Sequence, residues 1–488
     1  MADDGTLLKN TLFNVLARGI ASGVPLLVSM YASRKIGVDA FGTAQYILWL
    51  IATVWMFLNF GLPITLVRFI ALRLGDRKKN AAHAMIAWSF SICLVLCSLG
   101  VVVFAFAFHA ASTLWLETFL LFVVMSFSSV LQSVNEGLMR FKHLFHVSLL
   151  SGCVMLACFF PVIRSYSLEG YIAVLIGGAI VSVVFMTAGL RGFSFLPRGK
   201  AAEIFGTDVR TFAFYSWLAA IISSFTWQSM ELFFIKTYLT SADVAYFSIA
   251  LLLASYVTQP IALLSSALLP YFSREVGGLD NRSAQGTYFF LTKLLAWLTF
   301  FACFFTAANS SFILTFIYGQ AYGPAKDVAA IVLSGSSFGT IAAVGSALLY
   351  AHGKSKFIAI FGSLGAMIAI FAGVLVIPTY GIIGAGISKV AIQMSMVIIG
   401  TFYIVKYLQF RFPFGGYVKS FFLSFLICLG LHLLFPAETV FQLFINACIT
   451  LLCYIIGTLA LSIFDMQEIN ALKLRVAEFF LGNPNETK

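Results

Sequence analysis

The sequence predicts an all-α polytopic membrane protein with about fourteen transmembrane helices. Three observations predict this fold class: 61% of the 488 residues are apolar, only 10% are charged, and the mean hydropathy is +0.98. Soluble domains are about 45–50% apolar and about 25% charged. Because a helix needs roughly 20 residues to cross a bilayer, this apolar content supplies about fourteen spans.

The expected helices are apolar runs of membrane length, separated by short polar or basic breaks. They cover residues 10–33, 40–60, 82–107, 114–137, 146–164, 170–190, 213–235, 244–270, 288–309, 326–350, 357–377, 382–405, 416–434 and 440–463. Two of the breaks depend on proline and glycine alone, at SLEG (167–170) and PTYG (378–381).

Basic residues predict how the helices are oriented. Lys and Arg exceed Asp and Glu by 11. In a soluble domain this surplus would suggest nucleic acid, but here it more naturally marks the cytoplasmic loops, so no nucleic-acid partner is expected. With a cytoplasmic N-terminus, 23 of the 30 Lys and Arg residues lie on the cytoplasmic side or at its helix edges. The other side holds only five: Arg34, Lys35, Arg164, Lys236 and Lys326. We therefore expect both termini in the cytoplasm.

No cofactor or metal site is expected. The eight cysteines lie inside apolar segments without metal-ligand spacing, and the six histidines form no HExxH-type pair. We expect the cysteines to be small core residues. A membrane enzyme, such as a polysaccharide polymerase or an acyltransferase, should have a large external loop or paired catalytic carboxylates or histidines near one face. The sequence shows neither feature, which favours a protein that is not an enzyme.

A weak internal duplication predicts two similar halves. GVDAFGTAQY from Gly37 resembles SADVAYFSIA from Ser241, with Phe41 aligned to Val244 at a separation of 203 residues, and EGYIA from Glu169 resembles YGIIG from Tyr380 at 211. We expect two six-helix lobes, 1–190 and 213–405, joined by a basic cytoplasmic linker, 191–212, with the last two helices and a tail in 406–488. Six is even, so the lobes would be related by a pseudo-twofold axis along the membrane normal, as in transporters. A channel-like or scaffolding subunit would not need such halves.

Arg18 is the most informative residue of the predicted spans, because an ionisable group there costs roughly 2.5–3.5 kcal/mol and usually faces a cavity or a partner. It lies roughly 12 Å into the first span, at 1.5 Å per residue. Asn10, Asn14, Arg18 and Ser22 recur every fourth residue and form one polar stripe. The stripe favours an aqueous cavity, although a structural ion pair or neighbouring carbonyl groups could also satisfy the guanidinium.

Further polar side chains interrupt three other predicted spans. Lys389 has Gln393 one turn deeper on the same face, and the alternative for this lysine is to snorkel to the membrane surface. Gln228 and Glu231 lie along one side of 213–235, where Glu231 could be an interfacial carboxylate. In 114–137, Gln132 and Glu136 repeat at four-residue spacing. Glu136 is expected to form a boundary ion pair with Arg140, one turn further on.

Four segments together resemble the polysaccharide transporter family, the O-antigen-type oligosaccharide flippases. These belong to the multidrug/oligosaccharidyl-lipid/polysaccharide exporter (MOP) superfamily. Residues 10–46 resemble the first helix of that family and its leucine/isoleucine-glycine-x-x-x-phenylalanine-glycine turn. Residues 231–250 resemble the start of its second half, with Glu231 where members often have Asp. FIYGQAYGPAKDVAAIVLSGSSF (316–338) and IPTYGIIGAGIS (377–388) match its later motifs.

This resemblance implies two six-helix lobes around a central cavity in a bacterial inner membrane. It implies that an undecaprenyl-pyrophosphate-linked oligosaccharide crosses the membrane by alternating access, for O-antigen (lipopolysaccharide) or exopolysaccharide biosynthesis. A polysaccharide polymerase and a chain-length regulator are the partners it suggests. The expected cavity residues are Asn14, Arg18, Gln132, Gln228, Glu231, Lys389 and Gln393, with Arg18 and Lys389 facing the pyrophosphate.

Two related functions remain open. A peptidoglycan lipid-precursor flippase would also have about fourteen spans. A cation-coupled drug exporter usually has about twelve, so the last two predicted helices argue against it. The sequence identifies neither the sugar nor the coupling ion.

Overall fold

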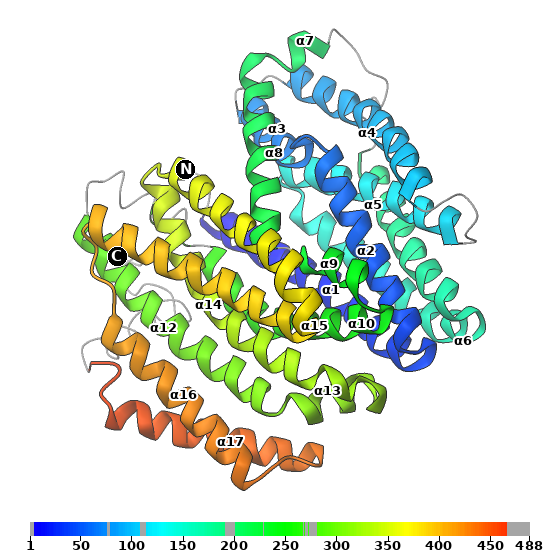
Figure 1. Cartoon of the computed structure of the whole chain (residues 1–488). Helices are drawn as coiled ribbons and strands as arrows, with labels where there is room; N and C mark the ends of the chain where they lie inside the picture. The colour runs from blue at the N-terminus through cyan, green and yellow to red at the C-terminus, as the bar shows by residue number, and fades with distance from the viewer. Residues whose placement is uncertain are drawn as a thin grey trace. The chain divides into compact units, whose positions relative to one another are not determined.

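The computed structural model describes residues 4–75, 79–107, 114–190, 201–227, 229–266, 268, 272 and 281–465. Within these ranges every regular element is helical (Figure 1), which confirms the all-α prediction. The helices are α1 (Asp4–Ile36), α2 (Val38–Leu58), α3 (Leu62–Gly75), α4 (Lys79–Ala107), α5 (Leu114–Gly137), α6 (Phe141–Ala188), α7 (Ala201–Ile204), α8 (Thr207–Trp227), α9 (Glu231–Tyr238), α10 (Ser241–Ser266), α12 (Asn281–Ala308), α13 (Ser310–Tyr318), the 3-10 helix η1 (Gln320–Ala325), α14 (Lys326–Ala351), α15 (Ser355–Tyr407), α16 (Phe414–Leu434) and α17 (Val440–Ala460).

Eleven helices of the described residues are long and apolar enough to cross a membrane, so the chain is a multi-pass membrane protein. The predicted span 213–235 is not among them, and the structure has two helices there: α8 ends at Trp227 and α9 begins at Glu231. Apolar composition continues across this break, which is why the sequence predicted one helix there.

The two longest spans, α6 and α15, each fold back on themselves. In α6, Ser167 has φ 51° and ψ −118°, a backbone conformation outside the helical region. The Ser151 hydroxyl donates to the Gly178 carbonyl at 2.8 Å, and a Cβ on Gly170 would lie 2.5 Å from the Val162 carbonyl oxygen. Residues so far apart along one straight helix could not touch. The two halves of α6 therefore pack against each other as an antiparallel hairpin.

The turn in α15 has the same construction as that in α6. Gly381 has φ 60° and ψ −145°, and a Cβ on Gly384 would lie 2.7 Å from the Val376 carbonyl oxygen. The predicted breaks at SLEG and PTYG thus fall on the two hairpin turns.

The two hairpins repeat at a separation of 214 residues. Ser167 corresponds to Gly381 and Gly170 to Gly384, each with the same role in its turn. The turns that precede the hairpins repeat at the same separation: Arg140 N–H donates to the Asn135 carbonyl, and Lys354 N–H donates to the Leu349 carbonyl, both at 2.9 Å. The separation of 211 inferred from EGYIA and YGIIG is therefore wrong by three residues. Those strings are similar in composition, but the turn geometry sets the register.

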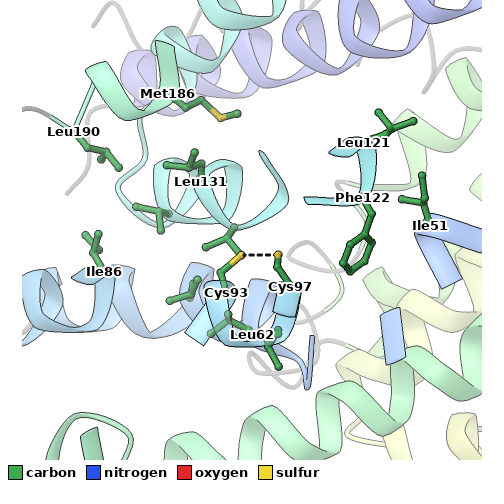
Figure 2. Packing of buried hydrophobic residues seen from close by; sticks show 14 of the residues in the cluster. Ile51, Leu62, Ile86, Cys93, Cys97, Leu121, Phe122, Leu131, Met186 and Leu190 are labelled. Carbon is green, nitrogen blue, oxygen red and sulfur yellow. Dashed lines mark hydrogen bonds between the residues drawn. The ribbon is translucent and has the colours of Figure 1, made fainter. Parts of the chain in front are cut away.

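The chain divides into two compact units, and each is described by itself. The first comprises Met1–Ala245 with Ile317–Ala321, and the second Tyr246–Phe316 with Tyr322–Lys488. The first unit packs aliphatic and aromatic side chains from α2 to α6 (Figure 2), among them Ile51, Phe122 and Leu131. Cys93 and Cys97 are buried in this core, as predicted, with their sulfur atoms 4.0 Å apart. Cys153, Cys158 and Cys448, however, are exposed on the protein surface rather than in a core.

In the second unit, α17 packs against α12 through Trp297. The indole stacks on Tyr454 with ring centroids 5.2 Å apart, and its N–H donates to the Thr458 hydroxyl at 2.8 Å. The Tyr454 hydroxyl donates to the Trp297 carbonyl at 2.9 Å. Lipid gives apolar helices little hydrophobic reason to associate, so stacking and interhelical hydrogen bonds hold such helices together. The terminal helices are therefore an integral part of this unit.

Candidate functional site

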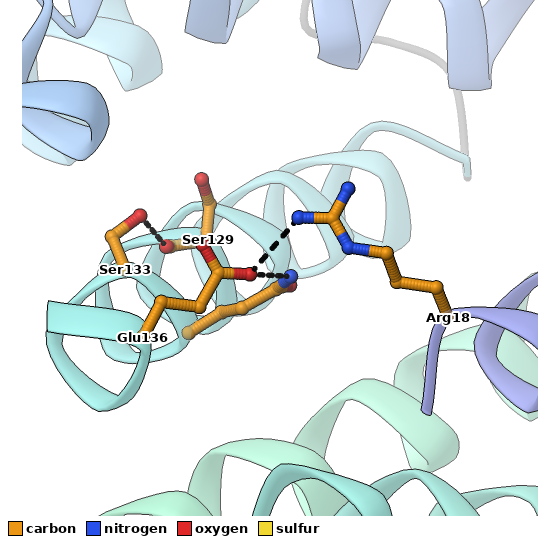
Figure 3. A network of polar contacts seen from close by, with 5 residues as sticks. Arg18, Ser129, Ser133 and Glu136 are labelled. Atoms are coloured by element: carbon orange, nitrogen blue, oxygen red, sulfur yellow. Dashed lines mark hydrogen bonds and ion pairs between the residues drawn. The ribbon is translucent and has the colours of Figure 1, made fainter. Parts of the chain in front are cut away.

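In the first unit, the side chain of Arg18 extends from α1 to α5, where it meets Glu136 and Gln132 (Figure 3). Arg18 Nη2 lies 3.4 Å from Glu136 Oε1, and Gln132 Nε2 donates to the same oxygen at 3.0 Å. Gln132 and Glu136 are four residues apart in a helix and therefore share one face. The structure thus brings together Arg18 and Gln132, two of the predicted site residues, around a carboxylate that the sequence had assigned elsewhere.

The predicted ion pair of Glu136 with Arg140 is wrong. Arg140 Nη1 donates to the carbonyl of Gly189, at the end of α6. The four-residue rule requires one continuous helix, but α5 ends at Gly137 and Met139 has φ 56°, so the chain turns before Arg140. Glu136 consequently faces α1 rather than its neighbour in sequence.

The contact between Arg18 and Glu136 is loose and accessible. The Arg18 side chain is 56% exposed and that of Glu136 is 17% exposed. A distance of 3.4 Å is long for a charge-assisted hydrogen bond, which is typically about 2.7–2.9 Å. A guanidinium group carries five N–H donors in a planar fork that suits carboxylate and phosphate oxygens. The site therefore presents an accessible guanidinium beside a carboxylate.

Two serines extend the polar face of α5 beyond this pair. Ser129 accepts a hydrogen bond at its hydroxyl from the Trp55 indole of α2, at 3.3 Å, and at its carbonyl from Ser133, at 2.9 Å. The sequence predicted a polar stripe here but not its connection to Trp55, because no local pattern marks a contact between α2 and α5. On α1, the Ser22 hydroxyl donates to the Arg18 carbonyl at 2.9 Å. The side chain of Asn14 lies outside the described residues.

Glu231 occupies the first turn of α9 and is only 2% exposed. The first turn of a helix favours an anion, since its N–H groups and dipole point toward it. Gln228 lies outside the described residues. Helix α9 packs on α2, where the rings of Phe233 and Trp49 are 6.4 Å apart, and its Lys236 ammonium donates to the hydroxyl of Ser241, the first residue of α10, at 2.7 Å.

Lys389 and Gln393 lie one turn apart on α15 in the second unit. They are 3% and 6% exposed, so the lysine is enclosed by protein and does not snorkel to the surface. Gln393 points toward α14, because a Cβ on Gly335 would lie 3.0 Å from its Oε1. Among the residues that the structure describes, this oxygen has no hydrogen-bond partner. A buried acceptor of this kind usually has a partner.

No group of three or more metal-ligating side chains occurs in the described part of the chain. Each candidate cluster instead combines a cation with an amide: Arg18 with Gln132 in the first unit, and Lys389 with Gln393 in the second. Such pairs can bind an anionic headgroup and the hydroxyl groups beside it.

A family described as "Polysaccharide biosynthesis protein" matches residues 7–276. No curated protein matches the sequence. Among solved structures, "Lipid II flippase MurJ, inward closed conformation" is 17% identical, with a TM-score of 0.73 over 92% of this chain and 98% of that one.

Two MOP superfamily transporters also share the fold. The inward-facing conformation of a multidrug resistance MATE family transporter is 15% identical, with a TM-score of 0.65 over 80% of this chain and 97% of that one. A transporter from Pyrococcus furiosus is 15% identical, with a TM-score of 0.57 over 81% of this chain and 94% of that one. The chain therefore has the fold of these MOP superfamily transporters and of the flippase.

Proposed function

We propose that this chain, which belongs to the family of polysaccharide biosynthesis proteins, moves a lipid-linked oligosaccharide across a membrane. The substrate in this proposal is an undecaprenyl-pyrophosphate-linked repeat unit for O-antigen or exopolysaccharide. It crosses the bacterial inner membrane by alternating access, and both termini of the chain lie in the cytoplasm. A polymerase and a chain-length regulator would then act on the transported unit.

The observation that carries this proposal is the exposed, loosely paired Arg18. Moving a pyrophosphate through a membrane requires a cation that binds it and then releases it. Arg18 contacts a carboxylate at 3.4 Å while remaining 56% exposed, so the carboxylate can yield to phosphate and return afterwards. In this scheme Glu136 is an internal competitor that prevents the pyrophosphate from binding too tightly to leave.

The other predicted residues have supporting roles in the proposal. Lys389 supplies the second cation, and Gln132 and Gln393 supply amide groups for sugar hydroxyls or phosphate oxygens. Asn14, Gln228 and Glu231 complete the proposed lining. Support for Lys389 comes from its burial beside Gln393, since a lysine enclosed in a membrane-spanning helix usually marks a substrate or ion pathway.

The charge of Arg18 also separates this proposal from drug export. A cation-coupled exporter of organic cations would place an exposed guanidinium where it repels its own substrate. A peptidoglycan lipid precursor, by contrast, carries the same pyrophosphate, and the Arg18 site would accept it equally well. The sugar attached to the pyrophosphate must therefore be tested directly.

The test is reconstitution of the purified protein into liposomes that contain a fluorescent undecaprenyl-pyrophosphate oligosaccharide or lipid II. Appearance of the sugar on the opposite leaflet is read by a membrane-impermeant quencher. We expect faster transfer of the oligosaccharide lipid than of lipid II. Faster transfer of lipid II would make the protein a peptidoglycan precursor flippase. Transfer of neither lipid, at a rate above that of protein-free liposomes, would exclude the proposed function.

A further inference from the structure

A cavity lies in the second unit, and neither Lys389 nor Gln393 lines it. Its volume is about 720 Å³, within the range of roughly 300–1,000 Å³ typical of ligand pockets. Helices α12, α13, α14 and α16 and the connection after α16 line it. None of the predicted site residues contributes to its lining, so the proposed function does not use it.

The position of this cavity is at a membrane boundary. Helix α12 ends at Ala308, α14 begins at Lys326 and α16 ends at Leu434, and residues close to each of these ends line the cavity. Helix ends of membrane-spanning segments lie near the level of lipid headgroups. The neighbouring helices α16 and α17 expose large apolar side chains, among them Phe422 and Phe441 at 55% and 72%. The cavity therefore lies near the helix ends, where α16 and α17 expose apolar side chains to lipid.

Charged and hydroxyl side chains line the cavity at the starts of α13 and α14, and larger apolar side chains line it further from the helix ends, where Ser334 of α14 is a polar exception. Lys326 and Asp327, both exposed, occupy the first turn of α14, and Ser310 and Ser311 begin α13. One to three turns from the ends, the walls consist of Phe304, Phe425, Cys428 and Leu429. A molecule that fills this space must therefore have a charged end at the boundary and an apolar part toward the membrane interior.

His432 adds an imidazole to the lining of the cavity. It lines the cavity from the last turn of α16, and its Nδ1 is buried without a hydrogen-bond partner among the described residues. Buried ring nitrogens normally have a partner, and His432 joins Lys326 as a lining residue that can donate from a side-chain N–H. An imidazole and a lysine ammonium that line one cavity can both donate to a phosphate group.

We propose that this cavity binds the headgroup of a phospholipid with an ethanolamine group. Lys326 and His432 bind the phosphodiester, and the Asp327 carboxylate binds the primary ammonium. Phe304, Phe425 and Leu429 contact the first methylene groups of the acyl chains. The pairing of a cation and an anion at adjacent positions favours a headgroup that itself carries both charges, rather than a purely anionic lipid.

The experiment measures which lipid stays with the purified protein. The protein is reconstituted with equal amounts of phosphatidylethanolamine, phosphatidylcholine and phosphatidylglycerol, extracted in mild detergent, and examined by native mass spectrometry. We expect ethanolamine lipid to be retained in preference to choline lipid, whose trimethylammonium offers no N–H to Asp327. The double variant Lys326→Met/His432→Phe should lose about tenfold in retention, since each contact to a charged group is a strong one.

Two further variants keep the test decisive if the double variant does not fold. Asp327→Asn should retain phospholipid but lose the preference for ethanolamine, and Ala330→Phe should reduce retention of every lipid by filling the cavity. Lys354→Met, an exposed lysine beyond the opposite end of α14, is the matched control and should retain lipid as the wild type does. Equal retention by all variants would overturn the proposal. Retention of phosphatidylglycerol above phosphatidylethanolamine would do so as well. Neither result measures transport. The lipid-binding proposal can therefore fail without contradicting the proposed function.

Discussion

Replacing Glu136 with glutamine tests whether this carboxylate competes with substrate for Arg18. The variant removes a negative charge but keeps an oxygen that can accept from Gln132. An ion pair that is largely exposed stabilises a protein by about 0–1 kcal/mol, and the exposure of Arg18 and the 3.4 Å separation place this pair in that class. Removing a competitor worth up to about 1 kcal/mol should strengthen binding of a pyrophosphate by up to about fivefold.

The assay measures equilibrium binding of undecaprenyl pyrophosphate to the protein in nanodiscs by microscale thermophoresis. The Kd of Glu136→Gln should fall by up to about fivefold, and the difference from wild type should shrink in high salt, because the Debye length decreases from about 10 Å at 0.1 M to about 3 Å at 1 M. Glu169→Gln, which removes an exposed carboxylate at the α6 turn, is the matched control. An unchanged or higher Kd for Glu136→Gln would refute competition.

Two other predictions follow from the hairpin turns and from the basic residues. Ser167→Gly should stabilise the protein by about 1 kcal/mol. A non-glycine residue at φ 51° costs on the order of 1–3 kcal/mol, and the greater freedom of glycine in the unfolded chain cancels part of that gain. Gly381→Ala, at φ 60°, should destabilise the protein, and thermal unfolding in detergent measures both variants. A lower Tm for Ser167→Gly would contradict the assigned strain. In a cysteine-free background, Lys326→Cys should react with an impermeant maleimide added to intact cells and Lys354→Cys should not. The reverse pattern would place the N-terminus outside the cytoplasm.

The sequence was sufficient for most of the fold, because lipid permits few backbone structures. Apolar runs of about 20 residues must be helices, and breaks at SLEG and PTYG correctly located the turns within α6 and α15. The interruption between α8 and α9 left no such signal, since no proline or glycine occurs between Trp227 and Glu231. The lobe boundaries at 190 and 213 stay a prediction.

The candidate site was less predictable, because it depends on contacts between distant helices. The four-residue stripe correctly put a polar face on α5, and periodicity alone marks such a face. The contact of Arg18 with Glu136 depends on how α1 and α5 each pack against α6, which no local pattern records. In the same way, burial distinguishes an enclosed Lys389 from one that snorkels, and burial is a property of the packed unit.

The most direct test of the central claim, that a phosphorylated headgroup crosses the membrane at Arg18, is an Arg18→Ala variant in a strain that depends on this gene for its surface polysaccharide. With Arg164→Ala as the control, at an exposed arginine near the α6 turn, surface polysaccharide and lipid-linked oligosaccharide are measured at equal protein levels. We expect Arg18→Ala to lose the polysaccharide and accumulate the lipid-linked unit inside the cell, with partial recovery in Arg18→Lys. Normal polysaccharide in correctly inserted Arg18→Ala would contradict the claim.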